Sequence, residues 1–356
     1  MECNSGGKAV RVLVVKPSSL GDIVHTMPAV TELRAAIPGV EITWVVNDSL
    51  SALVALCPGI AILPFPRKAL GKFSWVALRS FRRALRASSF DAVLDFQGLF
   101  RSGLISWLAR SSKRYGFANA REGATFFYTN KVVLPKELRH AADKNLFLAR
   151  TFLKEQGIAL PETPWETQTR IPETWRTEAE TLIRENHLSD GPLLAVGCSS
   201  RWNTKSWPEE YFGDVLRQVA ARRPDVRIWL LGASDEADRA ERVRVSSGLK
   251  QVTNLAGKTD MGALVALLAQ SKALFTNDSG PMHIAALLGV PCVANFGSTD
   301  PGMTGPYGPE GRHEIVRSLC AKSPCFCREC PRGDNALCCA GVTREKVVSA
   351  ILQRLS

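Results

Sequence analysis

Two loops of this sequence carry residue types that could bind a phosphorylated ligand and move a proton. The first, KPSSLGD (16–22), follows an apolar run and opens into an amphipathic stretch. On the simplest interpretation its last residue, Asp22, caps the following helix. At the carboxyl end of a strand the same carboxylate could instead act as a general base, and Gly21 would permit a tight turn and close approach by a ligand.

The second loop, TNDSGPMH (276–283), also joins an apolar run to a helical pattern. Its small residues Ser279 and Gly280 precede Pro281, which suits the first turn of a helix. Free backbone N–H groups at such a helix start favour a diphosphate. His283, about one turn further on, could contact the same ligand or be a partly buried histidine of the core.

A third segment, CSSRWNTKSWP (198–208), follows another apolar run. Lys205 stands just before a predicted helix, where it could contact phosphate or be an ordinary surface lysine. The first loop lacks the pattern GxGxxG, and the chain has no GxxxxGK followed by Ser or Thr. A dinucleotide-dependent dehydrogenase and a P-loop nucleotidase are therefore disfavoured.

Strand and helix patterns alternate twice along the chain, which places such loops at strand ends. Apolar runs typical of buried parallel strands occur at 9–15, 41–46, 91–96, 193–197, 227–232, 272–277 and 291–296. Helical spacing lies between them, including one continuous stretch at 23–37, and prolines at 161, 164 and 172 mark a linker. We expect two doubly wound α/β domains, 1–172 and 173–342, and a helix at 343–356 that could pack back on the N-terminal domain.

Composition narrows the class of protein. With 356 residues, 45% hydrophobic and 22% charged, the chain can fold into two hydrophobic cores, which excludes a disordered or fibrous protein. No apolar run approaches the roughly 18 residues that span a bilayer, and the N-terminus lacks a signal-peptide pattern, so we expect a soluble cytoplasmic protein. The net charge of +11 suits nucleic acid, an anionic membrane or a phosphorylated substrate, or it is ordinary solvated surface.

Four segments, in the expected order and spacing, resemble one family. They are KPSSLGDIVHTMPAV (16–30), SSRWNTKSWPEEYF (199–212), LGASDE (231–236) and a long segment at 276–309 that begins TNDSGPMHIAALLG. Together they resemble the ADP-heptose:lipopolysaccharide heptosyltransferases of glycosyltransferase family 9, from about residue 10 to 355. The resemblance implies a GT-B fold, in which two Rossmann-like domains face a cleft, the N-terminal one binding the acceptor and the C-terminal one the nucleotide sugar.

The resemblance also implies roles for individual residues. Asp22 matches the catalytic aspartate that deprotonates the acceptor hydroxyl, and Arg121 matches an arginine that faces the anionic acceptor. Ser18, Ser19 and Gly21 match the loop around the transferred sugar. The residues that match the donor site are Ser199, Ser200, Lys205, Glu236, Asp278, Ser279, Gly280 and His283.

Within that donor site, Lys205 matches a lysine on the diphosphate, and Glu236 lies where an acidic residue holds the ribose hydroxyls. Inversion at the anomeric carbon needs one base and stabilisation of the departing ADP, which a lysine and a helix N-terminus supply without a metal. We therefore expect no cofactor for catalysis. Because an aspartate is a weak base at its usual pKa of ~3.9, we expect partial burial in a closed cleft to raise the pKa of Asp22.

Two further segments, LDFQGLFRSG (94–103) and ANAREGATFFY (118–128), resemble the heptosyltransferase I branch. That branch moves L-glycero-D-manno-heptose from ADP-heptose to the Kdo of the lipopolysaccharide inner core, in Kdo2-lipid A. Two alternatives stay open: heptosyltransferase II or a protein O-heptosyltransferase on the same fold, and a non-catalytic nucleotide- or metal-binding module. The module would have no need of a base such as Asp22.

A basic stretch interleaves with apolar residues at 67–86. Its charged members are Arg67, Lys68, Lys72, Arg79, Arg82, Arg83 and Arg86. The stretch could be a core-facing helix with a solvated basic side, or a surface that docks on the anionic inner face of the cytoplasmic membrane. No nucleic-acid-binding motif accompanies the charge, so we expect a peripheral membrane enzyme with no nucleic-acid partner.

Six of the ten cysteines lie at 320–339. Without a signal peptide, such a cluster favours metal or reduced thiols over a disulfide framework. Relatives often carry a similar element, which this chain fits at Cys320, Cys325, Cys330 and Cys338 or Cys339. A structural zinc or iron bound by Cys320, Cys325, Cys330 and Cys338, and free or disulfide-bonded loop cysteines, both stay open.

Overall fold

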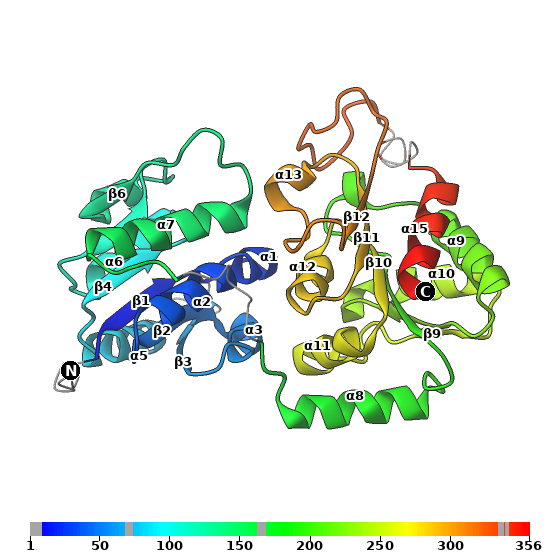
Figure 1. Ribbon diagram of the computed structural model, residues 1–356, viewed down its shortest axis with the longest axis horizontal. Helices are drawn as coiled ribbons and strands as arrows, with labels where there is room; N and C mark the ends of the chain where they lie inside the picture. Colours follow the sequence, from blue (N-terminus) through cyan, green and yellow to red (C-terminus); the bar gives the residue numbers. More distant parts are fainter. Residues whose placement is uncertain (1–8, 68–73, 162–168, 334–337, 339–341) are drawn as a thin grey trace. The chain divides into compact units, whose positions relative to one another are not determined.

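The computed structural model describes residues 9–67, 74–161, 169–333, 338 and 342–356. The chain divides into two compact units, Met1–Arg170 and Ile171–Ser356. The sequence placed this division at residue 172, in a proline-rich linker of which residues 162–168 lie outside the described part. In each unit, helices cover both faces of one sheet (Figure 1).

The first unit is built on a sheet of six parallel strands in the order β3-β2-β1-β4-β5-β6. The strands are β1 (Arg11–Val15), β2 (Glu41–Asn47), β3 (Ile60–Phe65), β4 (Ala92–Asp95), β5 (Arg114–Phe117) and β6 (Asn130–Val132). The helices are α1 (Leu20–Val24), α2 (Met27–Ala36), α3 (Ser51–Ala55), α5 (Trp75–Ala87), α6 (Phe100–Leu108) and α7 (Ala141–Glu155), with short 3-10 turns η1 (Asp48–Leu50) and η2 (Ala124–Phe127).

Alternating side chains bury both faces of this sheet. Leu13 of β1 belongs to an apolar cluster with Phe81 and Leu85 of α5 and Ile105 of α6. Val14, which points to the opposite face, is also fully buried, and α2 and α7 pack against each other there. A strand that is buried on both faces is continuously apolar, which is why the sequence identified β1 without ambiguity.

The helix predicted at 23–37 is interrupted. It forms α1 and α2, separated by His25 and Thr26, and Pro28 lies in the first turn of α2. Proline has no N–H to continue an earlier helix and disfavours helical geometry in the residue before it. The hydroxyl of Thr26 donates to the carbonyl of Asp22 at 2.8 Å, which joins the two pieces. The break leaves α1 as a separate short helix directly after β1.

The second unit has six parallel strands in the order β12-β11-β10-β7-β8-β9. The strands are β7 (Leu193–Gly197), β8 (Arg227–Leu231), β9 (Val252–Asn254), β10 (Ala273–Asn277), β11 (Cys292–Phe296) and β12 (Glu314–Arg317). The helices are α8 (Glu173–Glu185), α9 (Glu209–Arg222), α10 (Ala237–Ser247), α11 (Met261–Gln270), α12 (Gly280–Leu287), α13 (Pro301–Thr304) and α15 (Arg344–Leu355), with 3-10 turns η3 (Asn203–Lys205) and η4 (Ser234–Glu236).

Numbered within its own unit, each sheet has the strand order 3-2-1-4-5-6, the order of a dinucleotide-binding Rossmann fold. The expected pair of Rossmann-like domains is therefore confirmed. The sequence did not identify β3, β5, β6, β9 and β12. Most of these strands are three or four residues long, too short for a clear apolar run.

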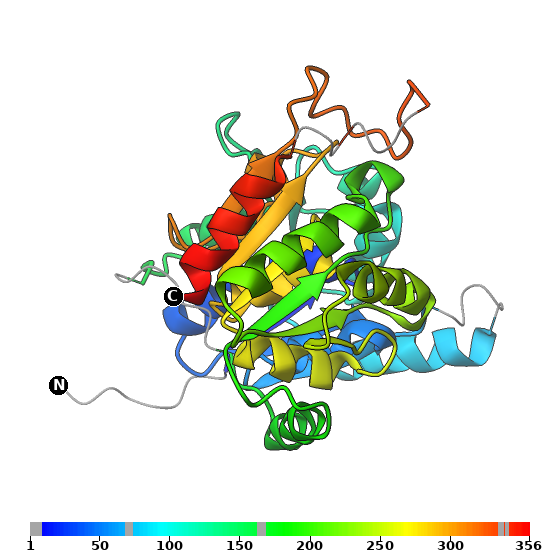
Figure 2. The same ribbon diagram turned by 90° about the vertical axis from the view of Figure 1, so that its right-hand side faces the viewer.

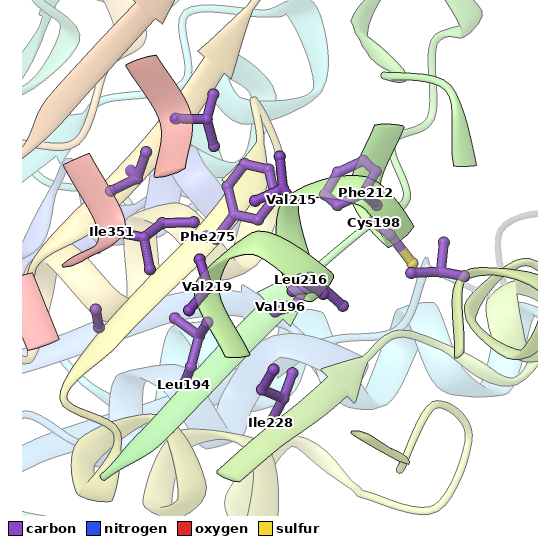
Figure 3. Close-up of a cluster of buried hydrophobic side chains, with 14 of the residues drawn as sticks. Leu194, Val196, Cys198, Phe212, Val215, Leu216, Val219, Ile228, Phe275 and Ile351 are labelled. Atoms are coloured by element: carbon purple, nitrogen blue, oxygen red, sulfur yellow. The ribbon is translucent and has the colours of Figure 1, made fainter. Parts of the chain in front are cut away.

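The C-terminal helix belongs to the core of the second unit. Figure 3 shows Ile351 of α15 beside Val219 of α9 and Phe275 of β10, and all three are fully buried. Figure 2 shows α15 alongside the strands of this sheet, and it contacts α9, β10, β11 and β12. The apolar face of α15 is therefore covered within the second unit. A contact of residues 343–356 with the first unit stays a prediction.

Strand order determines where ligands can bind. The order reverses between β1 and β4 in the first sheet, and between β7 and β10 in the second. Chains leave these neighbouring strands in opposite directions, which opens a crevice at their carboxyl ends. The loops that follow β1, β4, β7 and β10 are therefore the places where each unit can hold a ligand.

Candidate active site

The loop after β1 holds Asp22 in a short hydrogen-bonded ring. β1 ends at Val15 and α1 begins at Leu20, so Asp22 is the third residue of α1. Ser19 is the N-cap, and its backbone N–H and hydroxyl donate to Oδ2 of Asp22 at 2.9 and 2.7 Å. Asp22 therefore fixes the start of the helix, but as the partner of the N-cap rather than as the N-cap itself.

The Asp22 carboxylate is also within reach of solvent. Its side chain is 42% exposed, and Oδ1 lies 3.8 Å from Nζ of Lys16. Two donors from Ser19 and the ammonium of Lys16 therefore face this carboxylate. Gly21 lies inside α1, so the turn predicted at this glycine is made by the residues before it.

The loop after β4 supports the same edge of the sheet. The backbone N–H of Ser18 donates to Oε1 of Gln97 at 3.4 Å. Asp95, fully buried at the end of β4, accepts from the backbone N–H groups of Gln97 and Gly98 at 2.8 and 3.2 Å and from the Tyr128 hydroxyl at 2.7 Å. Burial raises the pKa of Asp95, and these donors oppose the rise. Asp95 thus holds the backbone of the loop after β4 in place through hydrogen bonds.

Arg121 joins this edge from the segment after β5. Its backbone N–H donates to the carbonyl of Gly98 at 2.9 Å, and its side chain is exposed. Gly98 has a φ of +66°, and a Cβ there would meet the Cβ of Ala120 at 3.3 Å, so glycine is required. Asp22 and Arg121 therefore lie on loops that both contact Gln97–Gly98, which suits a hydroxylated, anionic ligand.

In the second unit, Lys205 and Asp278 form an ion pair that joins the loops after β7 and β10. Nζ of Lys205 lies 2.7 Å from Oδ2 of Asp278, with side-chain exposures of 17% and 5%. The hydroxyl of Thr299, from the loop after β11, donates to the same oxygen at 2.6 Å. Ser200 donates its hydroxyl to the carbonyl of Asp278 at 3.2 Å. Asp278 therefore connects three loops at one edge of the sheet.

The start of α12 presents the features expected of a phosphate-binding turn. Ser279 is the N-cap, Gly280 and Pro281 are the first two helical residues, and His283 is buried one turn into the helix. The hydroxyls of Ser279 and Thr276 lie 3.1 Å apart. Pro281 has no N–H, and the N–H of Met282 donates to the carbonyl of Ser279 at 3.2 Å. The helix macrodipole favours negative charge at this end.

Two other predicted donor-site residues lie at the same edge. The buried hydroxyl of Ser199 has no hydrogen-bond partner within the described residues, which fits a position that a ligand completes. Glu236 ends η4 after β8, and its Oε2 accepts the backbone N–H of Ala233 at 2.8 Å. The structure thus brings the predicted donor-site residues to the carboxyl ends of β7, β8 and β10.

For the cysteine cluster, a structural metal and free or disulfide-bonded cysteines were both left open by the sequence. Within the described residues, no group of three or more Cys, His, Asp or Glu side chains is placed to hold a metal ion; Cys339 lies outside them. Cys338 is buried, while Cys320, Cys325 and Cys330 are partly exposed. Burial and the neighbouring Cys330, Cys325 and Cys320 raise the pKa of Cys338 to about 11. A structural zinc or iron bound by these four cysteines is unsupported among the described residues.

The Cys-rich segment is instead attached to the loop that carries Lys205. The hydroxyl of Thr204 donates to the carbonyl of Cys327 at 2.6 Å and lies 2.9 Å from the hydroxyl of Ser298. Its backbone N–H reaches the carbonyl of Arg328 at 3.4 Å. Thr204 is fully buried, so these contacts are shielded from water. The Cys-rich segment thus packs against the loop that carries Lys205 of the ion pair.

The Trp202 ring contacts both Arg328 of the Cys-rich segment and Lys205 of the ion pair. Nζ of Lys205 lies 4.5 Å, and the Arg328 guanidinium carbon 5.5 Å, from the centre of the Trp202 ring. Sequence reasoning missed Trp202, Thr204 and Thr299, because long-range contacts give them their roles. The one available signal was their place beside Lys205 or just after a predicted strand.

Two Rossmann-like units of six parallel strands each form the architecture of the GT-B fold. Residues 78–335 match the family model described as glycosyltransferase family 9 (heptosyltransferase). The chain belongs to this family, and it is therefore a glycosyltransferase.

Individual relatives agree with this assignment. The chain is 31% identical to lipopolysaccharide heptosyltransferase 1 of Pseudomonas aeruginosa over 90% of its length and 87% of the relative. It is 24% identical to lipopolysaccharide heptosyltransferase 2 of Escherichia coli over 87% and 88% of the two chains. Its fold is similar to the structure titled E. coli heptosyltransferase WaaC with ADP, with a TM-score of 0.76, 27% identity and coverage of 97% and 100%.

The contacts of Thr204 predict a stability effect. Thr204→Val keeps the shape of the side chain but leaves the carbonyl of Cys327 and the hydroxyl of Ser298 without this partner. We expect a loss of about 1–3 kcal/mol in the free energy of unfolding, measured by urea denaturation.

Thr204→Ser is the matched control, because it keeps the hydroxyl and removes only a methyl group. Its expected loss is below about 1 kcal/mol. Equal stability of Thr204→Val and the unaltered protein would show that the Cys-rich segment is not held through this residue.

Proposed function

We propose that this protein is an inverting heptosyltransferase that moves L-glycero-D-manno-heptose from ADP-heptose to the Kdo of Kdo2-lipid A. The observation that carries the proposal is that different residue types lie at the two reversal points. These are the places where strand order reverses, between β1 and β4 in the first unit and between β7 and β10 in the second. An exposed carboxylate, Asp22, follows β1 in the first unit. A lysine–aspartate pair beside the start of α12 follows β7 and β10 in the second.

The donor side is suited to a nucleotide diphosphate. Lys205 and the positive end of the α12 dipole offer positive potential where charge would develop on the departing ADP. The same strand ends carry Ser199, Ser200, Ser279, Gly280 and His283. Glu236, which ends η4 after β8, would accept hydrogen bonds from the ribose hydroxyls. Because Lys205 is already paired with Asp278, a bound diphosphate would share this lysine rather than meet a free charge.

On the acceptor side, Asp22 is the proposed base. As the acceptor oxygen bonds to the anomeric carbon, the bond from that carbon to the ADP phosphate breaks, and the hydroxyl proton passes to Asp22. Forming the new bond makes the hydroxyl acidic, so an ionised carboxylate of ordinary basicity can accept the proton. Ser18, Ser19 and Gly21 would border the transferred sugar, and the exposed guanidinium of Arg121 would contact the Kdo carboxylate or a lipid A phosphate.

The choice of acceptor rests on which group of relatives has the higher sequence identity to this chain. Identity is higher to relatives named heptosyltransferase 1 than to those named heptosyltransferase 2. The two segments around Asp95 and Arg121 also resemble the first of these branches. Heptosylated core and a protein hydroxyl are the acceptors to try next, while family membership sets aside a non-catalytic module.

Replacing the base tests this mechanism. Asp22→Asn keeps an oxygen that can accept from Ser19, so α1 should still begin correctly. We expect kcat for release of ADP from ADP-heptose, in the presence of Kdo2-lipid A, to fall about 100-fold or more. Binding of ADP, measured by calorimetry, should stay unchanged.

Asp48→Asn is the control, since Asp48 also starts a short helix in the first unit but follows β2, away from the reversal point. It should retain full turnover. Near-normal turnover by Asp22→Asn would reduce Asp22 to a structural residue. Tight binding of ADP-heptose without transfer by the unaltered enzyme would move the acceptor to heptosylated core or protein.

The basic helix α5 is the proposed membrane contact. Phe81 and Leu85 bury its inner face, whereas Trp75 and Val76 are 77% and 78% exposed at its start. Arg79, Arg82 and Arg83 are exposed along the helix, and Lys68 and Lys72 lie outside the described residues. Among the residues that the structure describes, none of the helices combines the length and apolarity that a bilayer crossing requires.

An exposed tryptophan beside arginines is typical of a surface that rests on anionic lipid. The lipid acceptor lies in a membrane, so a cytoplasmic enzyme bound to the inner face would meet it directly. Arg67 and Arg86 extend the same basic segment.

Removing three charges tests this surface. We expect the Arg79→Gln/Arg82→Gln/Arg83→Gln variant to bind vesicles containing phosphatidylglycerol about 30-fold more weakly or worse, measured by co-sedimentation. The Arg176→Gln/Arg184→Gln variant of α8 is the control and should bind normally. Equal binding of the triple variant, or binding that ignores anionic lipid content, would contradict a membrane role for α5.

A further inference from the structure

Lys16 is a buried lysine directly beneath Asp22. It follows the last residue of β1 and is only 6% exposed. Its Nζ donates to the carbonyl of Phe96 at 2.8 Å, and its own carbonyl accepts the indole N–H of Trp44 at 3.2 Å. Burying an ammonium is costly unless opposite charges compensate for the lost hydration. The position therefore calls for an explanation beyond packing.

Two carboxylates provide that compensation. Oδ1 of Asp22 lies 3.8 Å from Nζ, and Asp95 at the end of β4 also attracts the ammonium. Desolvation lowers the pKa of Lys16, while both carboxylates raise it. Asp95 already accepts from two backbone N–H groups and from Tyr128. Asp22 has the more exposed of the two carboxylates that face Lys16.

We propose that Lys16 is a positioning residue for heptose transfer, which holds the Asp22 carboxylate ionised and directs its Oδ1 inward while Ser19 holds Oδ2. The inference rests on the proposed role of Asp22 as the base. A base works only in its ionised form, and an adjacent ammonium extends that form to lower pH. Transfer of the acceptor proton to Asp22 removes this stabilisation, so the proton is readily released to solvent and the base is restored.

The charge of Lys16 acts separately from its packing. A positive charge within 4–6 Å lowers the pKa of a carboxyl by about 1–3 units, whereas an apolar side chain of the same length has no such effect. Other titratable groups lie near α1: His25 and His140 meet edge to face, with ring centres 5.0 Å apart.

The first test measures the pKa of the Asp22 carboxyl directly. Full-length protein is labelled with ¹³C at the aspartate carboxyl, and the Asp22 signal is assigned by its absence in Asp22→Asn. In Lys16→Met the pKa of Asp22 should rise by at least about one unit, and Lys16→Arg should restore it. Trp44→Phe is the matched control, because it removes the hydrogen bond to the Lys16 carbonyl without changing any charge, and it should leave the pKa of Asp22 unchanged.

Kinetics give the second measurement. The acid limb of kcat/KM for transfer from ADP-heptose to Kdo2-lipid A should move to higher pH in Lys16→Met by the same amount as the Asp22 titration. An unchanged limb together with a shifted titration would show that Lys16 acts on Asp22 but not on catalysis, which overturns the positioning role. A lower but parallel pH profile would mean that Lys16 only supports the fold.

The outcomes separate this inference from the proposed function. An unaltered enzyme without transfer to Kdo2-lipid A, but with the carboxyl shift in Lys16→Met, would contradict the acceptor and leave the Lys16–Asp22 coupling in place. If Lys16→Met does not fold, Asp22→Asn gives the reciprocal measurement, since the coupling is mutual. The pKa of the Lys16 amine should then fall by a similar amount, and an unchanged value would overturn the proposal.

Discussion

The structure depends on one constraint: parallel strands end at a common edge, and a reversal of strand order opens that edge to a ligand. Each unit meets this constraint with the same order of six strands. The first reversal point gathers Asp22, Gln97 and Arg121 from loops far apart in sequence. The second gathers Lys205 and Asp278. In the proposed function, the first unit supplies a base and the second binds phosphate.

Both sites pair a cation with a carboxylate, but the pairs differ in burial. Lys205 and Asp278 are both largely buried at 2.7 Å, and Thr299 adds a hydrogen bond to the same carboxylate oxygen. In the other pair the ammonium of Lys16 is buried, whereas Asp22 is 42% exposed and 3.8 Å away. The close pair holds its lysine in place, whereas the looser pair leaves its carboxylate accessible to solvent.

Sequence reasoning located the loops well, because strands buried on both faces are continuous apolar runs and the loops follow them directly. It predicted the Asp22 and Ser279 turns for this reason. It missed Lys16, Thr204 and Thr299, whose roles come from contacts across 6 to 123 positions. The sequence left the structural metal open, because cysteine spacing does not reveal where a loop directs its side chains. An apolar helical face likewise does not identify the surface on which it packs.

Hydrogen exchange of the intact protein, with and without saturating ADP, tests whether the nucleotide diphosphate binds to the loops after β7 and β10. If it does, backbone amides at 198–206 and 278–284 should exchange more slowly, and those at 16–22 should be unchanged. Slower exchange confined to 16–22, or no change in either loop of the second unit while ADP is bound, would contradict it.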